Sequence, residues 1–139
     1  MPLQHMQIGE VAERTGLSLR TIRYYGEVGL VRPSARTHGG FRLYTEPDIA
    51  RLELIKRMKP LDFSLDEMGD LLGVLDRLNE PGLTQEDHDA LLERLVMYRL
   101  AAEERARALR EQLAVAEDFH ESLRTEISRQ RRIGDRSGS

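Results

Sequence analysis

The residues with the clearest chemistry lie in one short basic and aromatic stretch, Ser18 to Tyr25. It reads SLRTIRYY and combines two arginines, two tyrosines and two hydroxyl side chains. Arginine can bond a guanine edge bidentately or clamp a phosphate, and hydroxyls suit phosphate oxygens. On a helix, Arg20, Arg23 and Tyr24 fan around the side that would face a groove. The residues predicted to contact nucleic acid are Ser18, Arg20, Thr21, Arg23, Tyr24 and Tyr25.

For some of these residues a purely structural role is the alternative. Tyr24 suits core packing and nucleic-acid contact equally well from its pattern alone. The arginine pair could instead be solvated, but the surrounding helix pattern favours contact with nucleic acid.

A second basic group surrounds a pair of glycines. Gly39-Gly40 predicts a tight turn before a strand over Phe41–Tyr44, with Leu30–Arg32 as the expected partner strand. A glycine tip can approach a backbone closely, so that Arg42 would point to a phosphate or a groove. An ordinary exposed hairpin is the alternative. The wing residues predicted to contact nucleic acid are Arg36, Arg42 and Tyr44.

Two short helices are expected to position the first basic group. Residues 9–15 and 19–28 have helical spacing and flank a short turn. Gly16 suits the end of the first helix, and Ser18 suits the N-cap of the second. A helix-turn-helix followed by a hairpin wing is a shape that reads duplex DNA. Residues 1–6 are expected to be a frayed end.

Two further helices are expected before a linker. Residues 46–59 have helical spacing, and Thr45 is a candidate cap. A capping box of Ser64 and Glu67 starts the next helix. The Asn-Glu-Pro-Gly run at 79–82 is typical of a linker.

The stretch from Thr84 to Arg132 lacks glycine and proline and predicts one long helix. Its apolar residues repeat with heptad spacing over about five repeats, which is typical of a coiled coil. A head of about 75 residues cannot bury that stripe alone, so a second copy is the simplest partner. Arg99 and His120 interrupt the stripe. The predicted dimerisation residues are Leu92, Leu95, Ala102, Ala106, Leu109, Leu113, Ala116, Leu123 and Ile127.

The sequence therefore predicts a mainly α protein with four parts. These are a winged helix-turn-helix head over 1–77, a linker over 78–84, a coiled-coil dimerisation helix over 85–132 and a disordered tail over 133–139.

Charge is distributed unevenly along the chain. Residues 1–60 contain ten Lys or Arg and six Asp or Glu, whereas residues 61–139 contain eleven Lys or Arg and eighteen Asp or Glu. The first part thus suits a polyanion, with chance segregation on solvated surfaces as the alternative.

Several classes of site are excluded or disfavoured. The chain has no cysteine, which excludes disulfides and thiolate metal sites. Without a secretory signal or a long apolar run, we expect a cytoplasmic protein with no membrane contact. Its four histidines are scattered and no nucleophile motif is present, so we expect neither an enzyme nor a cofactor. Residues 86–89 are a candidate divalent-metal cluster, although a polar helix start explains them better.

The run from Gln7 to Leu75 resembles the DNA-binding domain of the MerR family of bacterial transcription regulators. The resemblance rests on IGEVAERTGLSLRTIRYY, GLVRP, GGFRLYTEPDIARL and FSLDEM. Departures are Gly26, where an acidic residue is common, and Pro60 and Asp62, where the family usually reads L-G-F. The resemblance implies recognition-helix contacts and wing contacts to DNA by Arg20, Arg23, Tyr25, Arg36, Arg42 and Tyr44.

The resemblance also implies a mode of action. Family members are homodimers whose long helices pair antiparallel. They often bind a palindrome in a promoter whose −35 to −10 spacer is too long, and they distort it so that RNA polymerase engages both elements. The implied partners are double-stranded promoter DNA, a second copy and, indirectly, RNA polymerase. A simple occluding repressor and a coiled-coil protein-interaction module are the alternatives.

No effector is identified by the sequence. Metal- and thiol-sensing relatives use cysteines, which this chain lacks. Drug-sensing relatives append a large ligand domain, and only about seven residues follow the predicted helix. Either there is no small-molecule effector, or a ligand binds between the head and the dimer helix.

Overall fold

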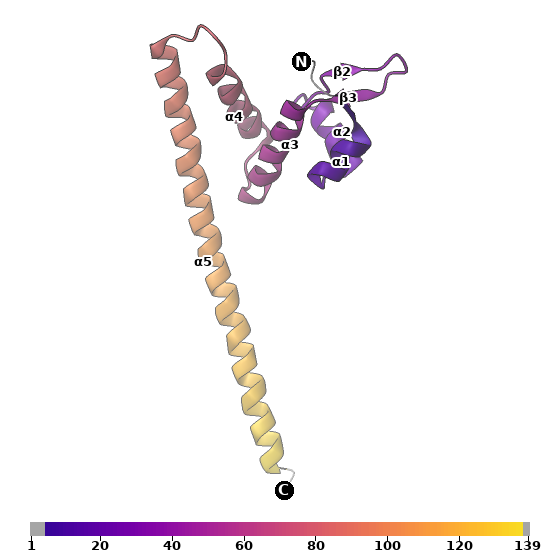
Figure 1. The fold of residues 1–139 in the computed structure, drawn as a ribbon. Coiled ribbons are helices and arrows are strands. Elements are labelled where there is room, and N and C mark those ends of the chain that lie inside the picture. The colour runs from indigo at the N-terminus through magenta and orange to yellow at the C-terminus, as the bar shows by residue number, and fades with distance from the viewer. Residues whose placement is uncertain (1–4, 138–139) are drawn as a thin grey trace. The chain divides into compact units, whose positions relative to one another are not determined.

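The protein is described by a computed structural model over residues 5–137, and it is mainly α as predicted (Figure 1). The chain divides into two compact units that meet between Tyr98 and Arg99. The elements are β1 (Met6–Gln7), α1 (Ile8–Thr15), α2 (Leu19–Glu27), β2 (Ala35–Arg36), β3 (Arg42–Tyr44), α3 (Glu46–Met58), the 3-10 turn η1 (Lys59–Leu61), α4 (Leu65–Leu78) and α5 (Gln85–Ser137).

The turn between α1 and α2 is fixed by the caps that the sequence predicts. Gly16 adopts a left-handed conformation with φ 73°, and its N–H donates to the Ala12 carbonyl oxygen. Ser18 is the N-cap of α2, where its hydroxyl oxygen accepts from the Thr21 N–H at 3.1 Å. A left-handed glycine and a serine cap satisfy backbone groups at both helix ends, so the predicted helix-turn-helix is confirmed.

The core of the head is built from one apolar face of each helix. Its fully buried side chains include Val11 of α1, Ile22 of α2, and Leu52 and Ile55 of α3. The buried positions of each helix lie three or four residues apart, as expected for helices that bury one stripe. The pairs are Val11 and Thr15, Ile22 and Tyr25, and Leu52 and Ile55. No helix of the described residues is long and apolar enough to cross a membrane.

The wing sheet pairs differently from the prediction. Strand β3 is central, with β2 (Ala35–Arg36) on one side and β1 (Met6–Gln7) on the other, both antiparallel. The predicted partner Leu30–Arg32 is wrong, because the N–H groups of Leu30 and Val31 donate to the Tyr25 carbonyl oxygen at 2.9 and 3.1 Å. Their side chains are buried, so this segment ends α2 and fills the core.

Among the described residues, regular secondary structure extends further toward both termini than the sequence predicts. Met6 is buried and pairs with Tyr44 in the sheet, so the expected frayed end does not extend to it. Residues 1–4 of that prediction lie outside the described residues. Helix α5 continues to Ser137, where a disordered tail was expected from 133, and residues 138–139 lie outside the described residues. Gly134 costs only about 1 kcal/mol in a helix, which the helix-forming residues around it tolerate.

The beginning of α5 belongs to the head. Leu91 is buried, and the rings of Tyr98 and Phe63 lie 6.3 Å apart. Asp70 of α4 accepts from the Tyr98 hydroxyl at 2.6 Å and also bonds the Arg94 guanidinium. One carboxylate therefore holds two side chains of α5, and the compact head extends to Tyr98.

This junction has a consequence for the titration of Tyr98. Burial, and after it the hydrogen bond to Asp70, raises the pKa of Tyr98 to about 12. Because the folded pKa is raised, the stability it confers is fully present below the ordinary value of about 10 and is lost as the pH rises through about 12. We expect Asp70→Asn to lower this pKa, as followed by tyrosinate absorbance.

The Tyr98 signal is isolated by subtracting the titration of Tyr98→Phe from that of the parent. Tyr24→Phe is the matched control, because Tyr24 is half exposed and lies outside the junction. A Tyr98 phenol that titrates at about 10 would show that the Asp70 bond is absent in solution.

Candidate nucleic-acid interface

Helix α2 presents one apolar and one basic face. Ile22 is fully buried, whereas Arg20 and Arg23 are exposed and Tyr24 is 45% exposed. Arg23 and Tyr24 follow Arg20 by three and four residues, so both lie on the same solvent side of the helix as Arg20. The structure thus brings Arg20, Arg23 and Tyr24 together on one surface, as predicted for a recognition helix.

Two predicted contact residues, Tyr25 and Tyr44, lie in the core instead. Tyr25 is 4% exposed because it follows Ile22 by three residues on the buried face of α2. Tyr44 is 0% exposed, and it pairs with Met6 between the sheet and the helices. Burial raises the pKa of both phenols. Both side chains therefore pack in the core of the head, and Tyr25 also lines the hollow beside α2. A direct contact of either residue with DNA remains a prediction.

The hydroxyls of Ser18 and Thr21 are engaged with each other. The Ser18 hydroxyl donates to Thr21 Oγ1 at 2.9 Å and accepts from the Thr21 N–H. This pair fixes the first turn of α2 and thereby positions Arg20 and Arg23. Direct contact of the two hydroxyls with DNA remains a prediction.

The tip of the wing is held by its own backbone. The Thr37 N–H donates to the Phe41 carbonyl oxygen and the Gly40 N–H donates to the Thr37 carbonyl oxygen, both at 2.9 Å. Gly40 has φ 82°, a conformation that favours glycine. Arg36 is exposed beside this tip, where its Nη1 donates to the Gly40 carbonyl oxygen at 3.4 Å. A fixed tip presents Arg36 at a defined place.

Arg42 is half buried rather than fully exposed. Its Nη1 atom is buried, and so is the nearby Tyr44 hydroxyl, with which the guanidinium interacts. The Arg42 guanidinium opposes, without cancelling, the rise that burial causes in the pKa of Tyr44. A hollow of about 400 Å³ adjoins Arg42.

A second hollow, of about 450 Å³, lies beside the recognition helix. Lys59 contributes a positive charge to its lining and is not among the predicted contact residues. A single lysine at a helix end has no pattern that marks it in the sequence. Asp62 takes a left-handed conformation with φ 61° and ψ 35°, so aspartate supports this turn without glycine. The lining residues are Arg20, Thr21, Tyr24, Tyr25, Lys59, Asp62, Phe63, Leu65 and Met68.

Some arginines of the head form ion pairs and others do not. Elsewhere, Arg14 pairs with Glu46, and Arg51 pairs with Asp76. By contrast, no ion pair joins Arg20, Arg23, Arg32, Arg36 or Arg42 to any residue that the structure describes. These arginines lie on α2, on the wing and in the connection between them, and such a group of cations is expected of a phosphate-binding face.

The candidate metal cluster at 86–89 does not form. His88 Nδ1 lies 3.9 Å from the Asp89 carboxylate. Within the described part of the chain, no group of three His, Asp or Glu side chains is placed to hold a metal ion. These residues form the polar start of α5.

Comparison with known proteins identifies the family of this chain. The family profile of MerR helix-turn-helix regulatory proteins matches residues 6–73. The mercuric resistance operon regulatory protein of Bacillus cereus is 46% identical over 71 residues, which are 51% of this chain and 54% of that protein. This chain therefore spans about half the length of that relative.

Other relatives match over more of their length. The regulator CueR of Salmonella typhi is 34% identical over 117 residues, which cover 81% of this chain and 80% of that protein. The crystal structure of a MerR-family transcriptional regulator from Bacillus cereus has a TM-score of 0.57 and 29% identity, covering 84% of this chain and 75% of that one. The chain thus belongs to the MerR family of helix-turn-helix regulatory proteins, which are transcription regulators rather than enzymes.

Proposed function

We propose that this chain is a homodimeric, sequence-specific regulator that binds a pseudo-palindrome in promoter DNA. One observation carries this proposal. Arg20 and Arg23 are exposed on the solvent face of α2 in a MerR-type head, and neither forms an ion pair with a described residue. In a helix-turn-helix, the second helix enters the major groove. Arg20 and Arg23 would then meet base edges, and the wing would meet the phosphate backbone.

The second copy is proposed to cover the apolar stripe of α5. In the single chain, Leu109, Leu123 and Ile127 are each between 44% and 52% exposed. They recur at heptad spacing, so a second helix with the same pattern would bury them. This stripe is the physical reason to expect a dimer.

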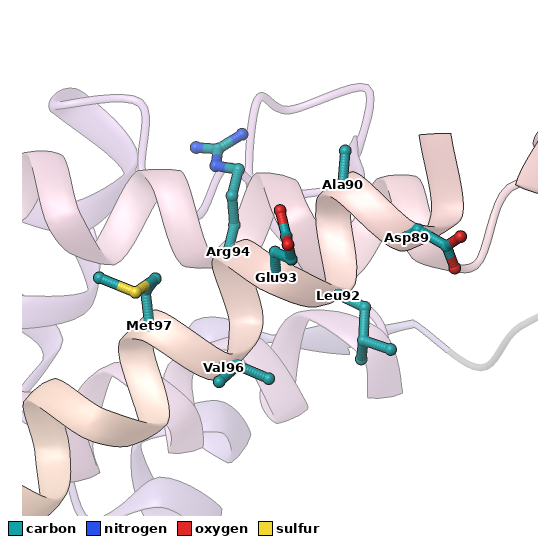
Figure 2. A pocket seen from close by; sticks show the side chains of 7 residues that line it. All are labelled: Asp89, Ala90, Leu92, Glu93, Arg94, Val96 and Met97. Atoms are coloured by element: carbon teal, nitrogen blue, oxygen red, sulfur yellow. The ribbon is translucent and has the colours of Figure 1, made fainter. Parts of the chain in front are cut away.

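The beginning of α5 offers additional apolar surface to a partner helix. An open hollow of about 740 Å³ there is lined by Asp89, Ala90, Leu92, Glu93, Arg94, Val96 and Met97. Figure 2 shows Leu92 and Val96 projecting from one side of the helix and Arg94 from another. Since Arg94 is bonded to Asp70 of the head, the side with Leu92 and Val96 is left for the partner.

Charge along α5 favours an antiparallel pair. Residues 85–98 contain four Asp or Glu and one Arg, whereas residues 124–136 contain five Arg and two Asp or Glu. Antiparallel helices place the acidic segment of one copy beside the basic segment of the other. Parallel helices would place like charges together, which is unfavourable at close range.

We expect Leu113→Glu to dissociate the dimer and Val115→Glu to leave it intact. Leu113 lies on the stripe and is 57% exposed, whereas Val115 is 71% exposed but lies on the opposite side of α5. Both substitutions add the same charge to the same helix. The two variants therefore differ in whether the new glutamate lies on the apolar stripe or on the opposite side of α5. Sedimentation equilibrium measures the mass of each variant, and equal behaviour of the two would argue against this stripe as the interface.

The orientation of the helices can be read from distances between spin labels. The chain has no cysteine, so a single cysteine placed at 108 or at 130 can be labelled specifically. In an antiparallel dimer, labels at 130 should lie about 60 Å apart, at ~1.5 Å per residue, while labels at 108 stay close. A parallel dimer would give short distances at both positions and would contradict the proposed orientation.

The binding site itself tests the function. Selection from random and genomic DNA at one physiological salt concentration should enrich a palindrome. A palindrome inside an overlong promoter spacer supports distortion of the DNA for RNA polymerase. A palindrome elsewhere over a promoter supports simple occlusion, and the absence of any enriched site would contradict the proposal in favour of a protein-interaction module.

A further inference from the structure

One buried carboxylate joins the two ends of the wing. Asp48 of α3 is 7% exposed, and its Oδ2 atom accepts hydrogen bonds from three donors. The Ser34 hydroxyl donates to it at 2.6 Å, and the N–H and the hydroxyl of Thr45 donate at 2.9 and 3.1 Å. Ser34 directly precedes β2, and Thr45 directly follows β3. These three residues, which we call the wing anchor, therefore connect both ends of the hairpin to α3.

The wing anchor holds a buried charge without a cation. Among the described residues, no ion pair joins Asp48 to an arginine, lysine or histidine. A buried carboxylate is unfavourable unless hydrogen bonds satisfy it. The 2.6 Å separation from the Ser34 oxygen is typical of a charge-assisted bond from a hydroxyl to a carboxylate, which is stronger than a neutral one. The Ser34 bond is therefore a strong attachment.

The two donor residues of the wing anchor have different roles. Thr45 is the N-cap of α3, and its bonds with Asp48 belong to the capping box of that helix. Ser34 takes no part in the capping box, because it comes from a segment 14 residues earlier in the chain. Removal of the Ser34 hydroxyl would leave the start of α3 capped. The Ser34 bond thus serves the wing rather than the helix.

Strand β2 depends on this bond because little else holds it. It is an edge strand of two residues, whereas β3 lies between two strands. Its register pairs are Ala35 with Leu43 and Arg36 with Arg42. The second pair places like charges directly opposite each other, which is unfavourable in a sheet. The bond of Ser34 to Asp48 therefore adds an attachment where the strand pairing is weak.

We propose that Asp48, acting through Ser34, is a positioning residue that fixes β2 and thereby places the Arg36 guanidinium for contact with a phosphate. Arg36 follows Ser34 by only two residues, and its side chain is exposed. Neither Ser34 nor Asp48 has to touch DNA for this effect. The phosphate contact of Arg36 rests on the proposed function, whereas the attachment of β2 to α3 does not.

The first arm of the test measures amide hydrogen exchange in the full chain without DNA. The Thr37 N–H donates to the Phe41 carbonyl oxygen within the wing, and the Leu30 N–H donates to the Tyr25 carbonyl oxygen after α2. Ser34→Ala should speed exchange at Thr37 by at least about threefold relative to Leu30, because local opening of the wing becomes easier. An unchanged ratio of the two rates would overturn the proposal.

Two further variants separate the wing anchor from a general loss of stability. Ser34→Thr keeps the hydroxyl and should exchange like the parent. Ser64→Ala is the matched control, because Ser64 is the N-cap of α4 and lies outside the wing. Loss of this cap should destabilise α4 but leave the ratio of the Thr37 and Leu30 rates at the parent value. If Ser64→Ala changes the ratio as much as Ser34→Ala does, the effect is general and the proposal is overturned.

The second arm measures binding to the selected DNA site in a double-mutant cycle. Ser34→Ala should weaken binding to all sequences by about two- to tenfold, as is typical of residues coupled through one network. Because Ser34 acts through Arg36, Arg36→Ala should cause a smaller loss in the Ser34→Ala background than in the parent. Arg23→Ala, on α2, should cause the same loss in both backgrounds, as expected of independent sites.

The two arms distinguish failure of this proposal from failure of the proposed function. Losses at Ser34 and Arg36 that simply multiply would overturn the positioning role, even if the first arm shows that Ser34 holds β2. If the parent chain binds no DNA, the proposed function fails. The first arm then decides by itself whether Ser34 and Asp48 attach β2 to α3.

Discussion

Replacing Leu52 by alanine is expected to lower the free energy of unfolding by about 2–5 kcal/mol. Leu52 lies in α3 and is fully buried in the core of the head. Truncation removes favourable burial and leaves a cavity that close-packed neighbours fill only in part. Because small domains are stable by only about 5–15 kcal/mol, this change would leave a large unfolded fraction under mild denaturant.

Denaturant unfolding of the head, followed by circular dichroism at one fixed protein concentration, measures this loss. The concentration is fixed because dimerisation would itself stabilise the chain. Leu65→Ala is the matched control, because Leu65 is 38% exposed and its truncation opens no enclosed cavity. Equal losses for the two variants would show that α3 does not bury Leu52 in solution.

Replacing Arg23 by alanine is expected to weaken binding to the selected DNA site by about 1–3 kcal/mol, or roughly 5- to 150-fold. Arg23 is exposed on α2 and has no ion-pair partner among the described residues, so its guanidinium is free to read a base edge. The sequence preference should relax at one base pair of each half-site.

Arg36→Ala, on the wing, should instead weaken binding to all sequences alike. It should also flatten the salt dependence by about 0.9 per lost phosphate contact.

Both effects are measured by titration of the parent and of each variant with matched and mismatched DNA over a range of salt. Arg77→Ala is the control, since Arg77 is exposed at the end of α4 and lies outside both hollows. If Arg23→Ala binds like the control, the basic face of α2 is not the reading surface.

The parts of the fold that the sequence predicts well depend on local interactions. Gly16 and Ser18 define the turn before α2 through contacts within four residues. Ser64 and Glu67 likewise form the predicted capping box, with the Ser64 N–H donating to Glu67 Oε1 at 2.9 Å. Such signals are readable because donor and acceptor are close in the chain.

The wing shows where local signals fail. Its strands have two or three residues, which is too short for an alternating pattern to distinguish them from other apolar runs. The Leu30-Val31 pair looks like a strand, but its N–H groups are taken by the Tyr25 carbonyl oxygen. Tyr44 looks like a surface aromatic until the sheet places it against the core.

The candidate site was predictable in its residue types and less so in its geometry. Helical spacing correctly places Arg20 and Arg23 on the exposed face, but it cannot decide between Tyr24 and Tyr25 without knowing which side Ile22 buries. The contribution of Lys59 depends on contacts over about 40 residues of chain, which no local pattern encodes. The hollow beside Arg42 depends on strand register for the same reason.

The bonds of Asp70 to Arg94 and Tyr98 determine where the head can be cut or joined to the dimerisation helix of a relative. A fragment cut after Leu78 would keep every residue matched by the family profile, yet it would remove Leu91 and both partners of Asp70. A chimera that keeps this head and grafts a foreign dimer helix would therefore need its junction after Tyr98. In this protein, the transferable module ends about one quarter of the way along α5 rather than at the linker.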